Sequence, residues 1–178
     1  AMFAQMLSEE GTQIISGLAL GIDGAAHRGA LKAGADTYGV MGCGVNICYP
    51  SAHYKLYGQM IEHGGIISEF PLDTRPDRMH FPMRNRIISG LADAILVVEA
   101  KEKSGSLITA EFGLDQGKEI FAIPGRITDH LSGGCNRLIQ QGAHMAISPN
   151  DILEYLGVKC EKRLIIHEKN VNALAKPE

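Results

Sequence analysis

The sequence has 178 residues, 45% hydrophobic and 21% charged, which is typical of a folded globular domain and excludes an intrinsically disordered chain. Lys and Arg (17) are fewer than Asp and Glu (20), which excludes a histone-like polycation but not a local basic patch. No apolar run approaches the ~18 residues of a membrane span, and no signal peptide is recognisable. We therefore expect a cytoplasmic protein without a membrane partner. Its four cysteines are predicted to be reduced thiols, with no metal-ligand spacing among Cys and His.

Short runs rich in Ile and Val alternate with helical patterns along the chain. The predicted strands cover residues 12–17, 37–41, 65–69, 94–99, 119–123 and, weakly, 144–147. The predicted helices cover the opening segment and residues 22–33, 54–63, 84–91, 107–116, 137–141 and 151–156. This alternation predicts an α/β fold, a three-layer sandwich with a mainly parallel sheet between two helical layers. Loops at the C-terminal ends of its strands would form the ligand crevice.

The periodic pattern ends near the C-terminus. We predict one domain over residues 1–157, followed by a tail or linker over residues 158–178, where charges are mixed and periodicity is weak.

Glycines follow several predicted strands at the edge where the crevice would lie. Glycine lets backbone N–H groups approach an anion closely, and the free N–H groups of a helix start do the same. The predicted phosphate-binding loops contain Gly17, Gly21, Gly42, Gly44, Ser104 and Thr109. The alternative is that each glycine only turns the chain. The first loop lacks the G-x-G-x-x-G spacing, so its signal for a dinucleotide cofactor is weak.

An arginine-rich segment precedes the helix predicted over residues 84–91. Residues 75–86 contain four arginines and a histidine, with Phe81 among them and Pro82 next to it. Arginine supplies forked donors for phosphate, and an aromatic ring supplies a stacking face for an unpaired base. The segment therefore predicts binding of single-stranded nucleic acid. Because of Pro82, we expect no regular helix around Phe81.

Structural alternatives exist for the same side chains. In the structural alternative, Phe81 is a core residue. Arg84 and Arg86 then form ion pairs with Glu69 or Glu99.

Two more segments return to the same edge of the sheet. The Ser-Gly-Ser loop at residues 104–106 opens a helix and is predicted to bind an anion, the alternative being an N-cap without a ligand. The loop after residue 123 carries Arg126, which is predicted to add a phosphate contact. Asp23 is predicted to cap the helix that follows it.

The motifs in these segments resemble those of the DprA/Smf (DNA-processing protein A) family. The matching stretches, in order over about residues 11–157, are SGLALGIDGAAHRGAL, GCGVNICYP, ISEFPLD, HFPMRNRIISGLADAILVVEA, SGSLITAEFGLDQGKEIFAIPG and GCNRLIQQGA. The resemblance implies an extended Rossmann-like domain that binds single-stranded DNA and forms a homodimer. It also implies delivery of the strand to the recombinase RecA, in natural transformation where the host is competent. It implies no chemical reaction and no required cofactor.

The resemblance also implies positions for the DNA pocket. Arg78 corresponds to a phosphate contact and Phe81 to an aromatic that meets a base, while residues 84–85 and the loop at 105–106 form opposite walls. The full predicted DNA-binding set is Arg78, His80, Phe81, Arg84, Asn85, Arg86, Lys103, Gly105, Ser106 and Arg126.

One departure from the family is expected to affect the sheet. The family's domain normally begins with an earlier strand that ends in a Gly-Ser-Arg loop, and nothing here corresponds to it. The sheet is therefore predicted to lack that central strand, with exposed strand edges, and the domain to be N-terminally incomplete. The sequence is then either a fragment or a divergent member.

An alternative function is a nucleotide-binding or nucleotide-hydrolysing enzyme. The glycine-rich edge and SGSLITAE resemble, more distantly, the phosphate loop of LOG-like phosphoribohydrolases, with Glu111 as the catalytic carboxylate. The P-G-G-x-G-T-x-x-E motif of those enzymes is missing.

Overall fold

The structure is a computed structural model that describes residues 1–158. The predicted tail lies, apart from its first residue, outside the described residues.

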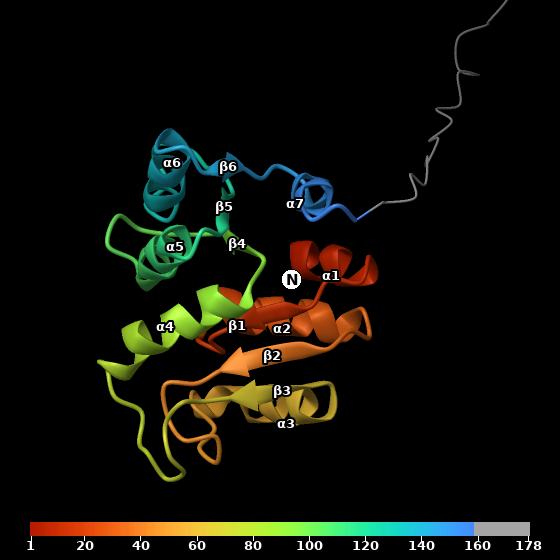
Figure 1. The fold of residues 1–178 in the computed structure, drawn as a ribbon, viewed down its shortest axis with the longest axis vertical. Helices are drawn as coiled ribbons and strands as arrows, with labels where there is room; N and C mark the ends of the chain where they lie inside the picture. The colour runs from red at the N-terminus through yellow and green to blue at the C-terminus, as the bar shows by residue number, and fades with distance from the viewer. Residues whose placement is uncertain (159–178) are drawn as a thin grey trace, which may run out of the picture.

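Helices and strands alternate along the described chain (Figure 1). The strands are β1 (Ile14–Ser16), β2 (Thr37–Val40), β3 (Gly64–Ile67), β4 (Ala94–Val97), β5 (Glu119–Ala122) and β6 (His144–Met145). The helices are α1 (Met2–Glu9), α2 (Ile22–Lys32), α3 (Tyr54–Glu62), α4 (His80–Leu91), α5 (Gly105–Asp115), α6 (Gly133–Gln140) and α7 (Pro149–Tyr155), with a 3-10 turn at Ser51–His53 before α3. Every predicted element is present, with shifted ends.

The strands form two parallel sheets of three strands each, in the orders β1-β2-β3 and β4-β5-β6. β1 and β4 are therefore edge strands, and both line a gap of about 650 Å³ that α1 and α7 also border. The described strands thus form two separate sheets, and the backbone groups on one side of β1 and β4 have no strand partner. The α/β class and the parallel pairing are confirmed.

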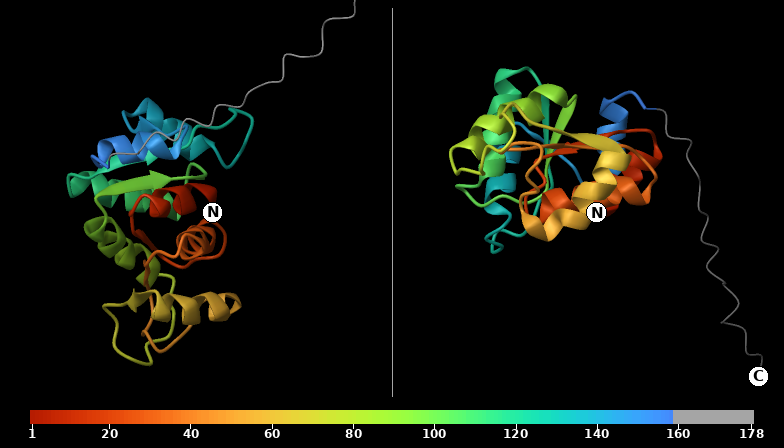
Figure 2. Two further views of the ribbon diagram at one scale, coloured as in Figure 1. Left: turned by 90° about the vertical axis from the view of Figure 1, so that its right-hand side faces the viewer. Right: turned by 90° about the horizontal axis from the view of Figure 1, so that it is seen from below.

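Two helical layers enclose the strands (Figure 2, right). The helices α1, α2, α3 and α7 lie on one side, where α2 contacts α1 and α3 and where α1 contacts α7. The helices α4, α5 and α6 lie on the other side, where α4 packs along α5. Within residues 1–158, no helix is long and apolar enough to cross a membrane.

The core is divided in the same way as the sheets. Leu18, Met41 and Met60 belong to a buried cluster that joins the first sheet to α3. A second cluster packs β4 and β5 against α5 and α6, and a third joins β5 to α1 and α7. Burial of such side chains stabilises the fold by roughly 1.5–3 kcal/mol each.

The helix α4 begins at His80, four residues before the predicted start at residue 84, and includes Pro82 in its first turn. The first N–H groups of a helix have no intrahelical partner, so a proline costs little there. This corrects the expectation of an irregular segment around Phe81. The consequence is that Phe81, Arg84 and Asn85 are fixed on one rigid element.

Candidate nucleic-acid interface

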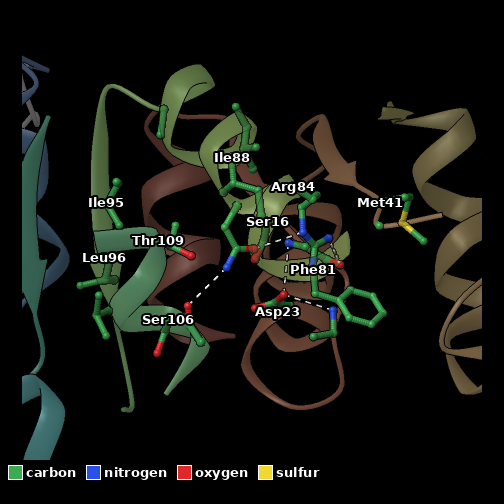
Figure 3. A pocket seen from close by; sticks show the side chains of 18 of the residues that line it. Ser16, Asp23, Met41, Phe81, Arg84, Ile88, Ile95, Leu96, Ser106 and Thr109 are labelled. Carbon is green, nitrogen blue, oxygen red and sulfur yellow. Dashed lines mark hydrogen bonds between the residues drawn. The ribbon is translucent and has the colours of Figure 1, made fainter. Parts of the chain in front are cut away.

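A cavity of about 530 Å³ lies at the C-terminal ends of β1 and β2 and along β4 (Figure 3). The helices α4 and α5 form two of its walls. The base of the cavity meets the gap between the two sheets, because residues of β1 and β4 line both spaces. Ligands of open α/β sheets bind at this end of the strands, so this cavity is the candidate site.

The loop after β1 is closed by an internal carboxylate. Oδ2 of Asp23 accepts hydrogen bonds from the backbone N–H groups of Gly17 and Ala19, each at 3.1 Å. These bonds argue against the predicted phosphate loop at Gly17, because a carboxylate of the chain itself already accepts from the loop's N–H groups. Asp23 is also not the predicted helix cap. Gly21 is the N-cap of α2, with φ +89°, and Asp23 lies in the first turn.

Arg84 is a buried anchor of α4. It is 5% exposed, and its Nη1 donates to the carbonyls of Gly17, at 2.8 Å, and Val40. Nε donates to Oδ1 of Asn85 at 3.2 Å. Burial lowers the pKa of Arg84, and the carboxylate of Asp23 opposes that shift. These contacts argue against the predicted phosphate contact of Arg84, because its guanidinium already donates to backbone carbonyls at the ends of β1 and β2.

The start of α4 packs closely on the end of β2. A Cβ on Gly42 would lie 2.8 Å from Cδ1 of Phe81, so only glycine admits the ring there. Nδ1 of His80 donates to the Gly42 carbonyl at 3.1 Å, and its ring stacks on Phe70 with centroids 4.1 Å apart. These contacts give His80 and Gly42 packing roles. Gly44 has a structural role as well, because its N–H donates to the carbonyl of Thr74 at 2.9 Å.

An aromatic pair lines the cavity. The rings of Tyr49 and Phe81 have centroids 5.7 Å apart and planes 23° apart. Phe81 is half-buried, whereas Tyr49 is 44% exposed. Tyr49 was not among the predicted site residues. The sequence feature that could have indicated it is its place in GCGVNICYP, where an aromatic follows the glycines at the end of a strand.

The opposite wall is the start of α5. Nδ2 of Asn85 donates to the carbonyl of Gly105 at 3.3 Å, which joins α4 to α5 across the cavity (Figure 3). The hydroxyls of Ser104 and Ser106 lie 2.9 Å apart, and Thr109 lines the wall one turn further on.

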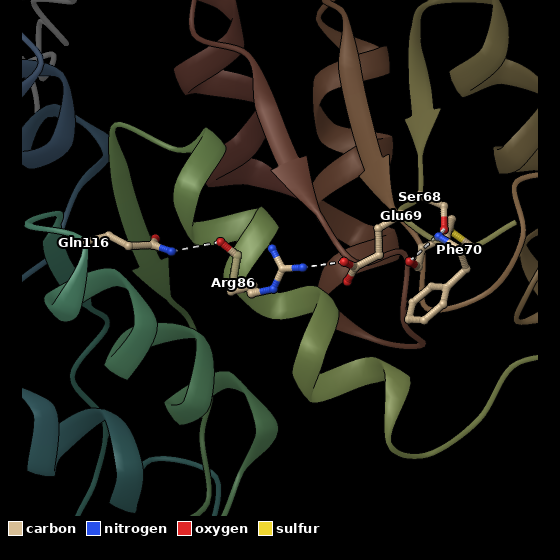
Figure 4. Close-up of polar contacts among 6 residues, drawn as sticks. Ser68, Glu69, Phe70, Arg86 and Gln116 are labelled. Atoms are coloured by element: carbon tan, nitrogen blue, oxygen red, sulfur yellow. Dashed lines mark hydrogen bonds and ion pairs between the residues drawn. The ribbon is translucent and has the colours of Figure 1, made fainter.

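Arg86 points away from the cavity. It forms an ion pair with Glu69, while its backbone carbonyl accepts a hydrogen bond from Nε2 of Gln116 at 3.0 Å (Figure 4). The structural alternative that pairs Arg86 with Glu69 is thus confirmed. Arg78 and Lys103 are exposed and precede α4 and α5 by a few residues, while Arg126 is exposed in the loop after β5. None of these four cations lines the cavity.

The sequence model of the DNA recombination-mediator protein A family matches residues 1–157. This chain belongs to that family. DNA processing protein DprA of Bacillus subtilis is 49% identical over 150 residues, covering 84% of this chain and 50% of that protein. Protein Smf of Escherichia coli is 48% identical over 156 residues, 87% of this chain and 42% of that protein. The chain thus spans about half the length of these curated relatives.

Two solved structures of DNA processing protein A have the same fold. The X-ray structure from Streptococcus pneumoniae matches with a TM-score of 0.80 and 44% identity, over 86% of this chain and 55% of that one. The structure of the protein from Helicobacter pylori matches with a TM-score of 0.77 and 31% identity, over 86% of this chain and 70% of that one. That structural study concerns the single-stranded DNA binding mode of the H. pylori protein.

Within this family fold, half of the predicted site residues meet at one cavity. The cavity wall includes Gly17, Gly42, Phe81, Arg84, Asn85, Gly105, Ser106 and Thr109. The predicted residues outside it are Gly21, Gly44, Arg78, His80, Arg86, Lys103, Ser104 and Arg126.

Proposed function

We propose that this chain binds single-stranded DNA at the cavity, with a base inside and the phosphates outside. The observation that carries this is the composition of the wall, where two aromatic rings are present and the one guanidinium is bound to backbone carbonyls. Asp23 adds a negative charge to the same wall, which disfavours a phosphate there. Aromatic rings stack on bases of any sequence.

The phosphates are assigned to exposed cations that lie outside the cavity wall. Arg78 and Lys103 precede the two helices whose starts form the walls, and Arg126 follows the strand next to β4. Their side chains are exposed, so they can follow a flexible strand. A local positive patch of this kind allows DNA binding although the net charge of the chain is −3.

Family membership supports the rest of the proposal. The H. pylori relative is known for a single-stranded DNA binding mode, and the family is described as one of recombination mediators. We propose that this chain acts as a non-catalytic homodimer that protects the strand and delivers it to the recombinase RecA. We do not propose nucleotide hydrolysis, because Glu111 is exposed and does not line the cavity.

Fluorescence anisotropy tests the proposal with a labelled oligo-dT and a duplex of equal length, each titrated at several salt concentrations. We expect preference for the single strand and an affinity that falls with salt, by a log–log slope of roughly −0.7 per neutralised phosphate. Arg78→Ala should make the slope shallower by about one such unit, whereas Lys32→Ala, at the end of α2, should leave it unchanged. Equal binding of duplex and single strand, or no salt dependence, would contradict the proposal.

A further inference from the structure

We infer that Tyr49 supplies the face on which the DNA base stacks, as the exposed member of an aromatic pair with Phe81. This inference rests on the proposed function and adds a residue that the DNA-binding segment around Phe81 does not contain.

The inner member of the pair is Phe81. Cζ of Arg84 lies 5.8 Å from the centroid of the Phe81 ring, a cation–π distance. The Phe81 ring also lies against Gly42, where a Cβ would be only 2.8 Å from Cδ1. Phe81 is therefore held between Arg84 and Gly42, which the fold itself fixes.

The outer member of the pair, Tyr49, is partly exposed. The Tyr49 ring continues the stack at 5.7 Å and 23° from Phe81, and no further ring within residues 1–158 stacks on it. Tyr49 is 44% exposed although it belongs to the cavity wall. A solvent-exposed aromatic at the edge of a cavity is the surface that an incoming planar group reaches first.

A base cannot enter between the two rings. Stacked bases are separated by about 3.4 Å, so a base between two rings requires roughly 7 Å between the ring planes. The centroids of Tyr49 and Phe81 are closer than this, at 5.7 Å. The base is therefore added to the free face of Tyr49, and Phe81 positions Tyr49.

The test compares a labelled oligo-dT with an oligomer of abasic deoxyribose phosphates of equal length, which has the same charge but no bases. Tyr49→Ala should weaken oligo-dT binding about 5- to 150-fold and leave binding of the abasic oligomer unchanged. Tyr49→Phe, which keeps the ring, should bind oligo-dT within about twofold of wild type. The matched control is Tyr54→Ala, because Tyr54 is 74% exposed and outside the cavity wall, and it should have no effect.

Tyr49→Trp provides a second measurement, because the chain contains no tryptophan. Saturating oligo-dT should quench the fluorescence of this single tryptophan, and the abasic oligomer should not. Unchanged fluorescence at saturation would overturn the inference, as would equal losses for Tyr49→Phe and Tyr49→Ala.

The outcomes separate this inference from the proposed function. If Tyr49→Ala binds oligo-dT as wild type does while Phe81→Ala loses binding, the stacking role of Tyr49 is wrong and the proposed site stands. If the wild-type chain binds neither oligomer, the proposed function itself fails.

Discussion

The guanidinium of Arg84 lies against the α-carbon of Gly17, where a Cβ would come within 2.6 Å of Nη2. Nη1 donates to the carbonyl of the same glycine at 2.8 Å. This contact fixes α4, which carries the candidate DNA-binding side chains, to the end of β1. An arginine in a basic segment can thus stabilise the fold by donating to backbone carbonyls.

Replacing Arg84 should lower the free energy of unfolding. Arg84→Ala leaves the carbonyls of Gly17 and Val40 buried without their donor, so we expect a loss of about 2–4 kcal/mol in the free energy of unfolding. Urea denaturation followed by circular dichroism measures this. Arg86→Ala is the control, since it breaks only a surface ion pair with Glu69 and should cost less than about 1 kcal/mol. Equal losses for the two variants would show that Arg84 is not an anchor.

Two glycines should respond oppositely to alanine. Gly42→Ala places a Cβ 2.8 Å from Phe81, so it should move that ring, destabilise the fold by about 1–3 kcal/mol and weaken oligo-dT binding. Gly58 lies inside α3, and a Cβ there would meet no atom within 4 Å, so Gly58→Ala should stabilise the fold by roughly 0.5–1 kcal/mol. Thermal melting and anisotropy measure both effects. Unchanged oligo-dT affinity in Gly42→Ala would contradict the packing assigned to Phe81.

His27 should make the fold sensitive to acid. It is fully buried, and the Thr37 hydroxyl donates to the Ile14 carbonyl, so Nδ1 of His27 must donate to that hydroxyl, at 2.7 Å. Nε2 has no partner. Burial lowers the pKa of His27 to about 4, and the nearby side chains of His53 and Arg28 contribute in the same direction.

The sign of the effect follows from these pKa values. Between its ordinary pKa of 6.5 and about 4, His27 binds a proton in the unfolded chain but not in the folded one. Stability should therefore fall by roughly 3 kcal/mol as the pH is lowered through this window, and His27 should contribute no further loss below it. Urea denaturation at several pH values measures the slope. His27→Asn keeps a donor for Thr37 but cannot titrate, so its slope should be shallower, and an unchanged slope would refute the assignment to His27.

The two strands that face the gap should exchange their amide hydrogens faster than the central strand of each sheet. β2 and β5 have a neighbour on both sides, whereas β1 and β4 have one neighbour and face the gap. About half of the N–H groups of an edge strand lack a strand partner. Hydrogen exchange read by mass spectrometry should show lower protection in β1 and β4 than in β2 and β5. Equal protection would mean that the gap is closed in solution.

The sequence predicted the order of elements because short apolar runs and helical periods are local patterns. Helix starts were less predictable. The helices α5 and α6 begin at Gly105 and Gly133. Glycine has a low helix propensity, so the sequence pattern did not indicate the first turn of either helix. The division between β1 and β4 depends on strand pairing, which composition does not contain.

The site was predicted in part for similar reasons. Phe81 and the loop at Gly105 and Ser106 were found from motif and residue type, and both line the cavity. Arg84 was assigned to phosphate because a sequence gives charge but not burial. Tyr49 was missed because its partner Phe81 lies far along the chain, and only the fold brings the two rings together.

Photo-crosslinking tests the central claim most directly. A single-stranded oligonucleotide with 5-iodouracil in place of thymine is bound to the 178-residue chain, irradiated and mapped by tandem mass spectrometry. Single-stranded DNA bound in the cavity places a base beside the aromatic pair, so crosslinks should concentrate there, chiefly at its exposed member Tyr49. Crosslinks at Tyr54 or on α6 and α7, with none at the aromatic pair, would place the DNA elsewhere and contradict the proposed site.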